Sequence, residues 1–120
     1  MTIPGHRHKR VAEEIRHEVT AMLAGELKDP RIAGIVTVTE VRVTPDLRQA
    51  RIFVSMMGSE AEQASTLKGL TAAAGFVRHE IAERLHLRRG PEIHFLLDRS
   101  AEYGERIEDL LRQVKKTEGA

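Results

Sequence analysis

Between residues 10 and 27 every third or fourth position is apolar, and charged residues fill most of the positions between. This spacing places the apolar side chains on one side of a helix, so it predicts an amphipathic helix from about Arg10 to Leu27. Asp29 precedes Pro30, a position that disfavours helical geometry, and the helix is expected to end there. The predicted apolar stripe consists of Val11, Ile15, Val19, Met22 and Leu23.

The next segment, Ile35–Thr44, changes to the two-residue period of a β-strand and is rich in β-branched residues. Its valines fall on one parity before position 39 and on the other parity after it. A β-bulge near Thr39 and Glu40 would bring both sets to the same face. A turn from Pro45 then leads to a second strand, which is apolar on both faces around Phe53 and is therefore expected at the centre of the sheet.

A two-helix unit is predicted next. Ser59 and Glu62 have the spacing of a capping box and open it. Within residues 67–87, two amphipathic helices are expected to meet at Ala73–Gly75. Gly75 is expected at the join, where a residue without a Cβ serves as a C-cap or lets two backbones approach closely. An ordinary glycine break with no functional role is the alternative.

A third strand is predicted over Glu92–Asp98 after a break at Gly90-Pro91, and Ser100 is the expected N-cap of a last helix. The apolar stripe of that helix consists of Tyr103, Ile107, Leu110, Leu111 and Val114. The fold class is therefore α+β, in the order α-β-β-α-α-β-α, with a three-stranded sheet and helices packed on one face. This is the element order of a type II KH domain. Residues 1–8 are expected to form a flexible basic arm, 9–116 the domain and 117–120 a short tail.

Composition narrows the class of protein. The chain has no cysteine, which excludes disulfides and cysteine-ligated metal sites. No apolar run has the length of a membrane span, and the first residues lack the apolar core of a signal peptide, so a cytoplasmic protein is expected. The aromatic content of 3% argues against base stacking on the sheet surface, as RRM domains use it.

The sequence offers no catalytic constellation. It contains no Walker loop, GxGxxG, HExxH or GxSxG motif, and no serine has a base placed to activate it. His6 and His8 lack a third ligand, and His94 lies within a strand, so neither a metal nor a cofactor is expected. A small hydrolase would need active-site residues that this chain does not display.

The remaining candidate is a basic set, since arginine suits phosphate through its planar fork. Two groups of cations and the residues of the bend could form one phosphate-binding face: Arg7, Lys9, Arg10, Ala73, Ala74, Gly75, Arg78, Arg84, Arg88 and Arg89. An ordinary solvated surface is equally compatible with the pattern, because Glu80 and Glu83 cancel part of the charge.

Several short segments, in this order and spacing, resemble the ribosome-binding factor A family of bacterial assembly factors for the small ribosomal subunit. The similarity covers roughly residues 8 to 115. It rests on Arg10–Ile15, Lys28–Arg31, Asp46-Leu47 with Ala50–Val54, and Ala73–Arg78.

The resemblance implies a KH-like fold in which Ala73-Ala74-Gly75 stands where ordinary KH domains carry GxxG. It implies a monomer without catalytic activity that assists cold-related maturation of 16S rRNA, including its 5′ end. The implied partners are the small subunit, near the 5′-terminal helix and the decoding region of its rRNA, and an assembly GTPase. The sequence given stops soon after Lys115-Lys116, so contacts of the kind made by the long charged C-terminal extension of some members are not expected here. A protein–protein adaptor that docks through its acidic last helix or its hairpin edge is the alternative function.

Overall fold

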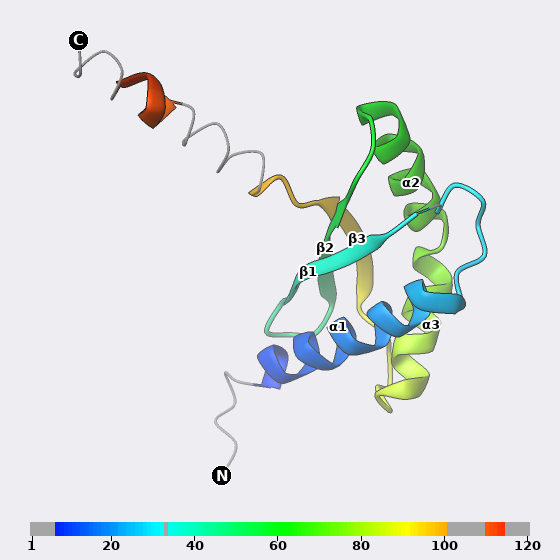
Figure 1. The fold of residues 1–120 in the computed structure, drawn as a ribbon. Coiled ribbons are helices and arrows are strands. Elements are labelled where there is room, and N and C mark those ends of the chain that lie inside the picture. Colours follow the sequence, from blue (N-terminus) through cyan, green and yellow to red (C-terminus); the bar gives the residue numbers. More distant parts are fainter. Residues whose placement is uncertain (1–6, 33, 101–109, 115–120) are drawn as a thin grey trace.

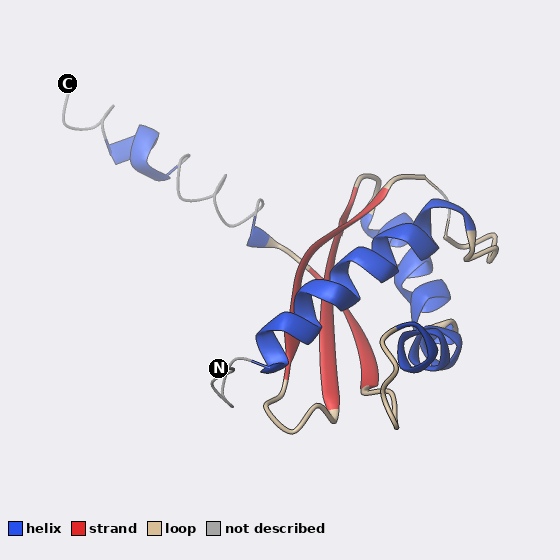
Figure 2. Cartoon of the chain, turned by 90° about the horizontal axis from the view of Figure 1, so that it is seen from below, coloured by secondary structure: helices blue, strands red, loops and turns tan. Residues whose placement is uncertain are grey.

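A three-stranded sheet carries three helices on one of its faces (Figures 1 and 2). The computed structural model describes residues 7–32, 34–100 and 110–114. Along the chain the elements are α1 (Arg7–Gly25), β1 (Val36–Val43), β2 (Gln49–Met56), α2 (Glu60–Ala72), α3 (Ala74–Arg84) and β3 (Glu92–Leu97). The central strand β2 pairs antiparallel with β1 and parallel with β3, and the parallel pairing is made possible by the α2–α3 crossover.

The bulge predicted in β1 is present. The register with β2 shifts between Val38 and Glu40, so Thr39 is the extra residue. Val38 before the bulge and Val43 after it are both buried against the helices. The central position predicted for the second strand is also confirmed.

The core lies between the sheet and the helices. It combines inward-facing residues of the strands with the predicted stripe of α1 and with apolar residues of α2 and α3, among them Leu70, Val77 and Ile81. In α1, Val11, Ile15, Val19 and Met22 are buried and Leu23 is half-buried. The predicted capping box is present as well, since the Ser59 hydroxyl accepts from the Glu62 amide at 3.1 Å.

Both ends of α1 differ from the prediction. The helix begins at Arg7, so Arg7 and His8 are helical rather than part of an arm, and residues 1–6 lie outside the described residues. It ends at Gly25, before the Asp29-Pro30 sequence, because the amides of Glu26 and Leu27 both turn back to the Met22 carbonyl, at 2.8 and 3.1 Å.

The segment after α1 then packs against α2 at Gly69. A Cβ on Gly69 would lie 2.9 Å from the Ile32 side chain and 3.1 Å from that of Arg31. A glycine is therefore needed at this position for the loop to lie on the helix.

The predicted last helix lies mostly outside the described residues, including Tyr103 and Ile107. Residues 110–114 are helical, but Leu110, Leu111 and Val114 are 60, 56 and 51% exposed. The expectation that this stripe is buried is therefore wrong for its described part. In the described part of the chain, no helix combines the length and apolar character that crossing a membrane requires.

Candidate nucleic-acid interface

The bend between α2 and α3 centres on Ala73 rather than on Gly75. Ala73 has φ −84° and ψ −4° and separates the two helices, while Gly75 lies inside the first turn of α3. Gly75 is not among the glycines in the left-handed region, and a Cβ on it would meet no atom within 4 Å. Neither structural reason predicted for this glycine therefore holds: it is not a C-cap, and no backbone of the described residues crowds it.

The close backbone approach occurs instead at Gly90, where the loop after α3 returns to the helix. A Cβ on Gly90 would lie 2.5 Å from the carbonyl oxygen of Arg78. The Nε of Arg78 donates to the Gly90 carbonyl at 2.8 Å. At the other end of the loop, His86 adopts φ 54° and the Leu87 amide donates to Ala82 at 2.9 Å. The loop carrying Arg88 and Arg89 is thus held at both ends.

Two adjoining hollows follow this loop, with volumes of about 720 and 490 Å³. Both are lined by Arg78, Leu87, Arg88, Arg89 and Gly90. We call them together the basic cleft. Its charged and titratable lining consists of Arg7, Arg48, Arg78, His79, His86, Arg88 and Arg89 with Asp46, Glu83 and Glu92.

Positive charge exceeds negative charge in the basic cleft, because five arginines face three carboxylates. Arg88 and Arg89 are exposed, and neither has a carboxylate partner among the described residues. The Thr44 hydroxyl and the Arg48 amide hydrogen-bond to Asp46 and lower the pKa of its carboxyl group, so this acid stays ionised. Two free guanidinium groups on a fixed loop suit an anionic backbone.

The structure brings together five of the predicted site residues. Arg7 from the start of α1 and Gly75, Arg78, Arg88 and Arg89 all line the basic cleft. The chain start and the region after the bend therefore lie side by side for these residues, whereas their binding of phosphate stays a prediction. Lys9 and Arg10 are exposed on α1 but do not line the cleft.

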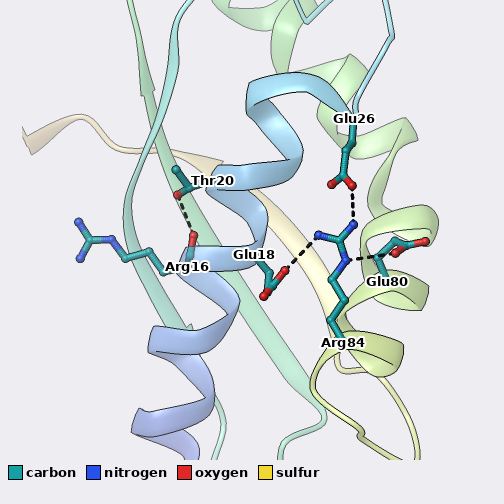
Figure 3. Close-up of polar contacts among 6 residues, drawn as sticks. All are labelled: Arg16, Glu18, Thr20, Glu26, Glu80 and Arg84. Carbon is teal, nitrogen blue, oxygen red and sulfur yellow. Dashed lines mark hydrogen bonds and ion pairs between the residues drawn. The ribbon is translucent and has the colours of Figure 1, made fainter.

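Arg84, also in the predicted set, has a different environment (Figure 3). Its Nε, Nη1 and Nη2 atoms contact Glu80 at 3.2 Å, Glu18 at 3.0 Å and Glu26 at 2.7 Å. These carboxylates, Glu26 foremost, raise the pKa of Arg84. The residue ties α3 to α1 and to the segment after it, and a phosphate would have to compete with three carboxylates for it.

The two alanines of the bend also face away from the basic cleft. Ala73 lines a separate small hollow of about 180 Å³ with Leu27, Ile32 and Phe76. Ala74 is half-buried and packs against the core. Of the bend, only Gly75 lies beside the arginines.

Three residues of the basic cleft were not in the predicted set: Arg48, His79 and His86. His79 and His86 were available from the sequence, since positions 75, 78, 79, 82, 83 and 86 recur on one side of a helix. Arg48 could not be found from the sequence, because its position depends on the shape of the hairpin turn, where Leu47 has φ 61°. It also depends on a distant contact, in which the Glu92 amide donates to the Arg48 carbonyl at 2.8 Å.

The chemistry available in the basic cleft is that of anion binding. Within residues 7–32, 34–100 and 110–114, no group of three or more His, Cys, Asp or Glu residues could hold a metal ion. The residues lining the cleft include no Phe, Tyr or Trp, so it offers no ring of these types on which a base could stack. The arrangement favours contact with sugar–phosphate backbone over reading of bases.

Comparison with known proteins points to one family. The family model of ribosome-binding factor A matches residues 7–111. Ribosome-binding factor A of Caldanaerobacter subterraneus subsp. tengcongensis is 46% identical over 114 residues, which are 95% of this chain and 93% of the relative. The protein of the same name from Acetivibrio thermocellus is 50% identical over 108 residues, 90% of this chain and 88% of the relative.

Solved structures that are similar to this chain belong to the same family or share its fold. A Thermotoga maritima protein assigned to ribosome binding factor A is similar at 33% identity with a TM-score of 0.67, over 80% of this chain and 91% of that one. The crystal structure of ribosome-binding factor A from Thermus thermophilus shares the fold, at 23% identity and a TM-score of 0.63, over 75% and 94% of the chains. A homology model of the Thermus thermophilus factor, fitted into a cryo-electron microscopy map of a 30S complex, has 26% identity and a TM-score of 0.57, over 80% and 96%.

Proposed function

Because this chain belongs to the ribosome-binding factor A family, we propose that it is a non-catalytic assembly factor of the small ribosomal subunit. It associates with free or immature small subunits in the cytoplasm and assists late maturation of their 16S rRNA, including the 5′ end. The Thermus thermophilus relative fitted into the map of a 30S complex supports this choice of partner.

The observation that carries the proposal is the basic cleft, which we propose as the RNA-binding surface. Its arginines come from the start of α1, the hairpin turn, α3 and the loop after α3, so they approach one hollow from several directions. A phosphate backbone following this surface would contact several guanidinium groups at once and release its counterions. With no Phe, Tyr or Trp in the lining, the cleft would recognise the shape and backbone of folded rRNA rather than a run of unpaired bases.

Within this proposal the cations have unequal roles. Arg88 and Arg89 are free to bind phosphate, and Arg78 contributes while holding the loop through Gly90. Arg7, His79, His86 and Arg48 extend the surface on either side. Gly75 leaves open space beside the arginines, where RNA can pass close to the backbone of α3.

Charge reversal tests the location of this surface. The double variant Arg88→Glu, Arg89→Glu should bind purified small subunits and their rRNA much more weakly than the natural chain. The slope of the logarithm of the binding constant against the logarithm of the salt concentration should be shallower by about two. Each lost phosphate contact lowers the magnitude of that slope by roughly one. The melting temperature should stay close to that of the natural protein, since both side chains are exposed.

The matched control is Arg16→Glu with Lys28→Glu, which makes the same change in net charge at exposed positions outside the cleft. This control should keep nearly all of the affinity. Equal losses in both double variants would mean that only overall charge matters and would refute the assignment of the cleft. Tight binding to subunits that is insensitive to salt would instead favour the adaptor function.

A further inference from the structure

The face of the sheet opposite the helices has an ordered pattern of its own. The register places Arg42, Arg51 and His94 side by side across the three strands, and all three are exposed. The next row on the same face contains Glu40, Phe53 and Leu96. A row of cationic and titratable groups therefore lies beside a partly apolar row, on the face of the sheet opposite α1, α2 and α3 (Figure 2).

The central cation of the first row, Arg51, has no acidic partner in the part of the chain that the structure describes. Arg42 is paired with Glu40 at 2.8 Å, and His94 lies 3.3 Å from Glu92. Arg51 has no ion pair or side-chain hydrogen bond with the described residues, although it lies directly opposite Arg42. Like charges directly opposite on a sheet are unfavourable, so an acidic group above Arg51 would be stabilising.

Two hollows on this face form a continuous groove. One, of about 750 Å³, runs from the hairpin turn at Thr44-Pro45 across to Leu96. The other, of about 420 Å³, runs from Phe53 to Asp98–Ser100. Both are lined by Phe53 and by Arg42, whose guanidinium lies 5.7 Å from the centre of the ring. The groove thus starts at the point where the C-terminal segment leaves the sheet.

We propose that the groove binds the C-terminal segment of this same chain, with Leu110, Leu111 and Val114 as its apolar contacts. These three side chains are among the most exposed large apolar groups of the described residues. Burying them over Phe53 and Leu96 removes two apolar surfaces from water at once. The sequence just before them, Glu105-Arg-Ile-Glu108-Asp109, supplies carboxylates for Arg51.

The length of the chain fits this occupant. Six residues of β3 span about 20 Å. The thirteen steps along the chain from Leu97 to Leu110 would span at least about 20 Å, since even a helix rises about 1.5 Å per residue, so this tether is long enough for Leu110–Val114 to reach Phe53 and Leu96. The tether also gives the segment a high effective concentration at the groove, an advantage that no separate ligand has.

Single-stranded RNA is less well matched to this groove. Base stacking needs open rings, whereas Phe53 is the only ring of Phe, Tyr or Trp lining the two hollows, is half-buried, and lies beneath the Arg42 guanidinium. An acidic segment with an apolar stripe can contact both rows of the face: its carboxylates pair with the cationic row, and its apolar side chains pack on the partly apolar row.

Paramagnetic relaxation in the full chain tests the proposal. Because the natural chain has no cysteine, a spin label can be attached at Thr117→Cys alone. Docking should cause selective loss of amide peak intensity for Arg51, Phe53, His94 and Leu96. The added changes Leu110→Ser and Leu111→Ser should restore the intensity. The matched control Met57→Ser removes a 95% exposed apolar side chain away from the groove and should leave the loss unchanged.

Charge provides a second, independent readout. Arg51→Glu should reduce the loss of amide peak intensity that the spin label causes at the sheet face. Combining it with Glu108→Arg and Asp109→Arg should restore that loss, because the charges are then exchanged between the two partners. An absence of broadening at the sheet face would overturn the proposal. So would broadening that appears only between an isotope-labelled chain and a separate spin-labelled chain, because the occupant would then be a second copy. Shifts at these amides caused by an oligouridine, without any effect of the leucine variants, would assign the groove to RNA instead.

Discussion

Arg84 and the pair Arg88-Arg89 lie within six residues of one another, yet they serve opposite purposes. Three carboxylates surround Arg84, two of them from α1 and the segment after it (Figure 3). Arg88 and Arg89 have no carboxylate partner among the described residues and face a hollow. The first arginine joins parts of the protein to each other, whereas the other two are available to an outside ligand.

The difference arises from position on the helix. Residues that fall on the side of α3 toward α1 meet the acidic groups of α1, and residues past the end of α3 turn toward the hairpin. A cluster of arginines in a sequence is therefore not yet a cationic surface. The surface consists of those guanidinium groups that the fold leaves without an internal partner, and three further variants test this distinction.

The largest effect is expected from Gly90→Ala. Its new Cβ would lie 2.5 Å from the Arg78 carbonyl oxygen and 2.9 Å from Arg78 Cγ, so backbone must move. We expect a loss of about 2 kcal/mol or more in the free energy of unfolding, measured in urea, as for other overpacked sites. Affinity of the folded fraction for small subunits should also fall, since the loop that presents Arg88 and Arg89 would be displaced. Gly25→Ala is the matched control, because a Cβ there meets no atom within 4 Å.

A smaller effect is expected from Arg84→Gln. Without the guanidinium, Glu18, Glu26 and Glu80 would face one another with no cation between them, so the melting temperature should drop. Subunit affinity of the folded protein should not change, in contrast to the Arg88→Glu, Arg89→Glu variant. Arg16→Gln, whose side chain points away from the cluster in Figure 3, should leave both quantities unaltered. A selective loss of subunit binding with an unchanged melting temperature would contradict the structural role of Arg84.

The smallest effect is expected from Gly75→Ala. Gly75 is helical and has open space around it, so alanine should raise the free energy of unfolding by about 0.5 to 1 kcal/mol. The same methyl group protrudes into the basic cleft, where it would weaken binding if RNA passes against the helix backbone. Higher stability with unchanged subunit affinity would show that the RNA contacts the loop but not the start of α3.

Local patterns in the sequence were sufficient to predict the elements from α1 to β3. The capping box at Ser59 and Glu62, the phase change at Thr39 and the stripe of α1 each depend on residues within a few positions of one another. The central place of the second strand followed from its being apolar on both faces. The predicted end of α1 was wrong because the chain turns at Gly25 through hydrogen bonds to Met22, before the proline has any effect.

The site was only partly predictable, because its composition depends on contacts between distant segments. Nothing near Gly90 in the sequence shows that Arg78 lies against it. Gly75 was predicted to be the special glycine because it stands where two amphipathic helices were expected to meet. Two of the three carboxylate partners of Arg84 are distant in sequence: Glu18 of α1 is 66 residues away, and Glu26 in the segment after α1 is 58 residues away. The sequence alone could therefore identify the arginines but not separate those that bind carboxylates from those that remain free.

The bulge at Thr39 has a consequence for how copies of this protein meet. β1 is an edge strand, and an edge strand exposes unpaired backbone groups that invite pairing with another chain. The extra residue interrupts that edge, so an added strand could stay in register with Val36–Val38 or with Glu40–Val43, but not with both. Glu40 and Arg42 also place charge on the same stretch. The kink that buries both sets of valines thus also limits edge-to-edge aggregation.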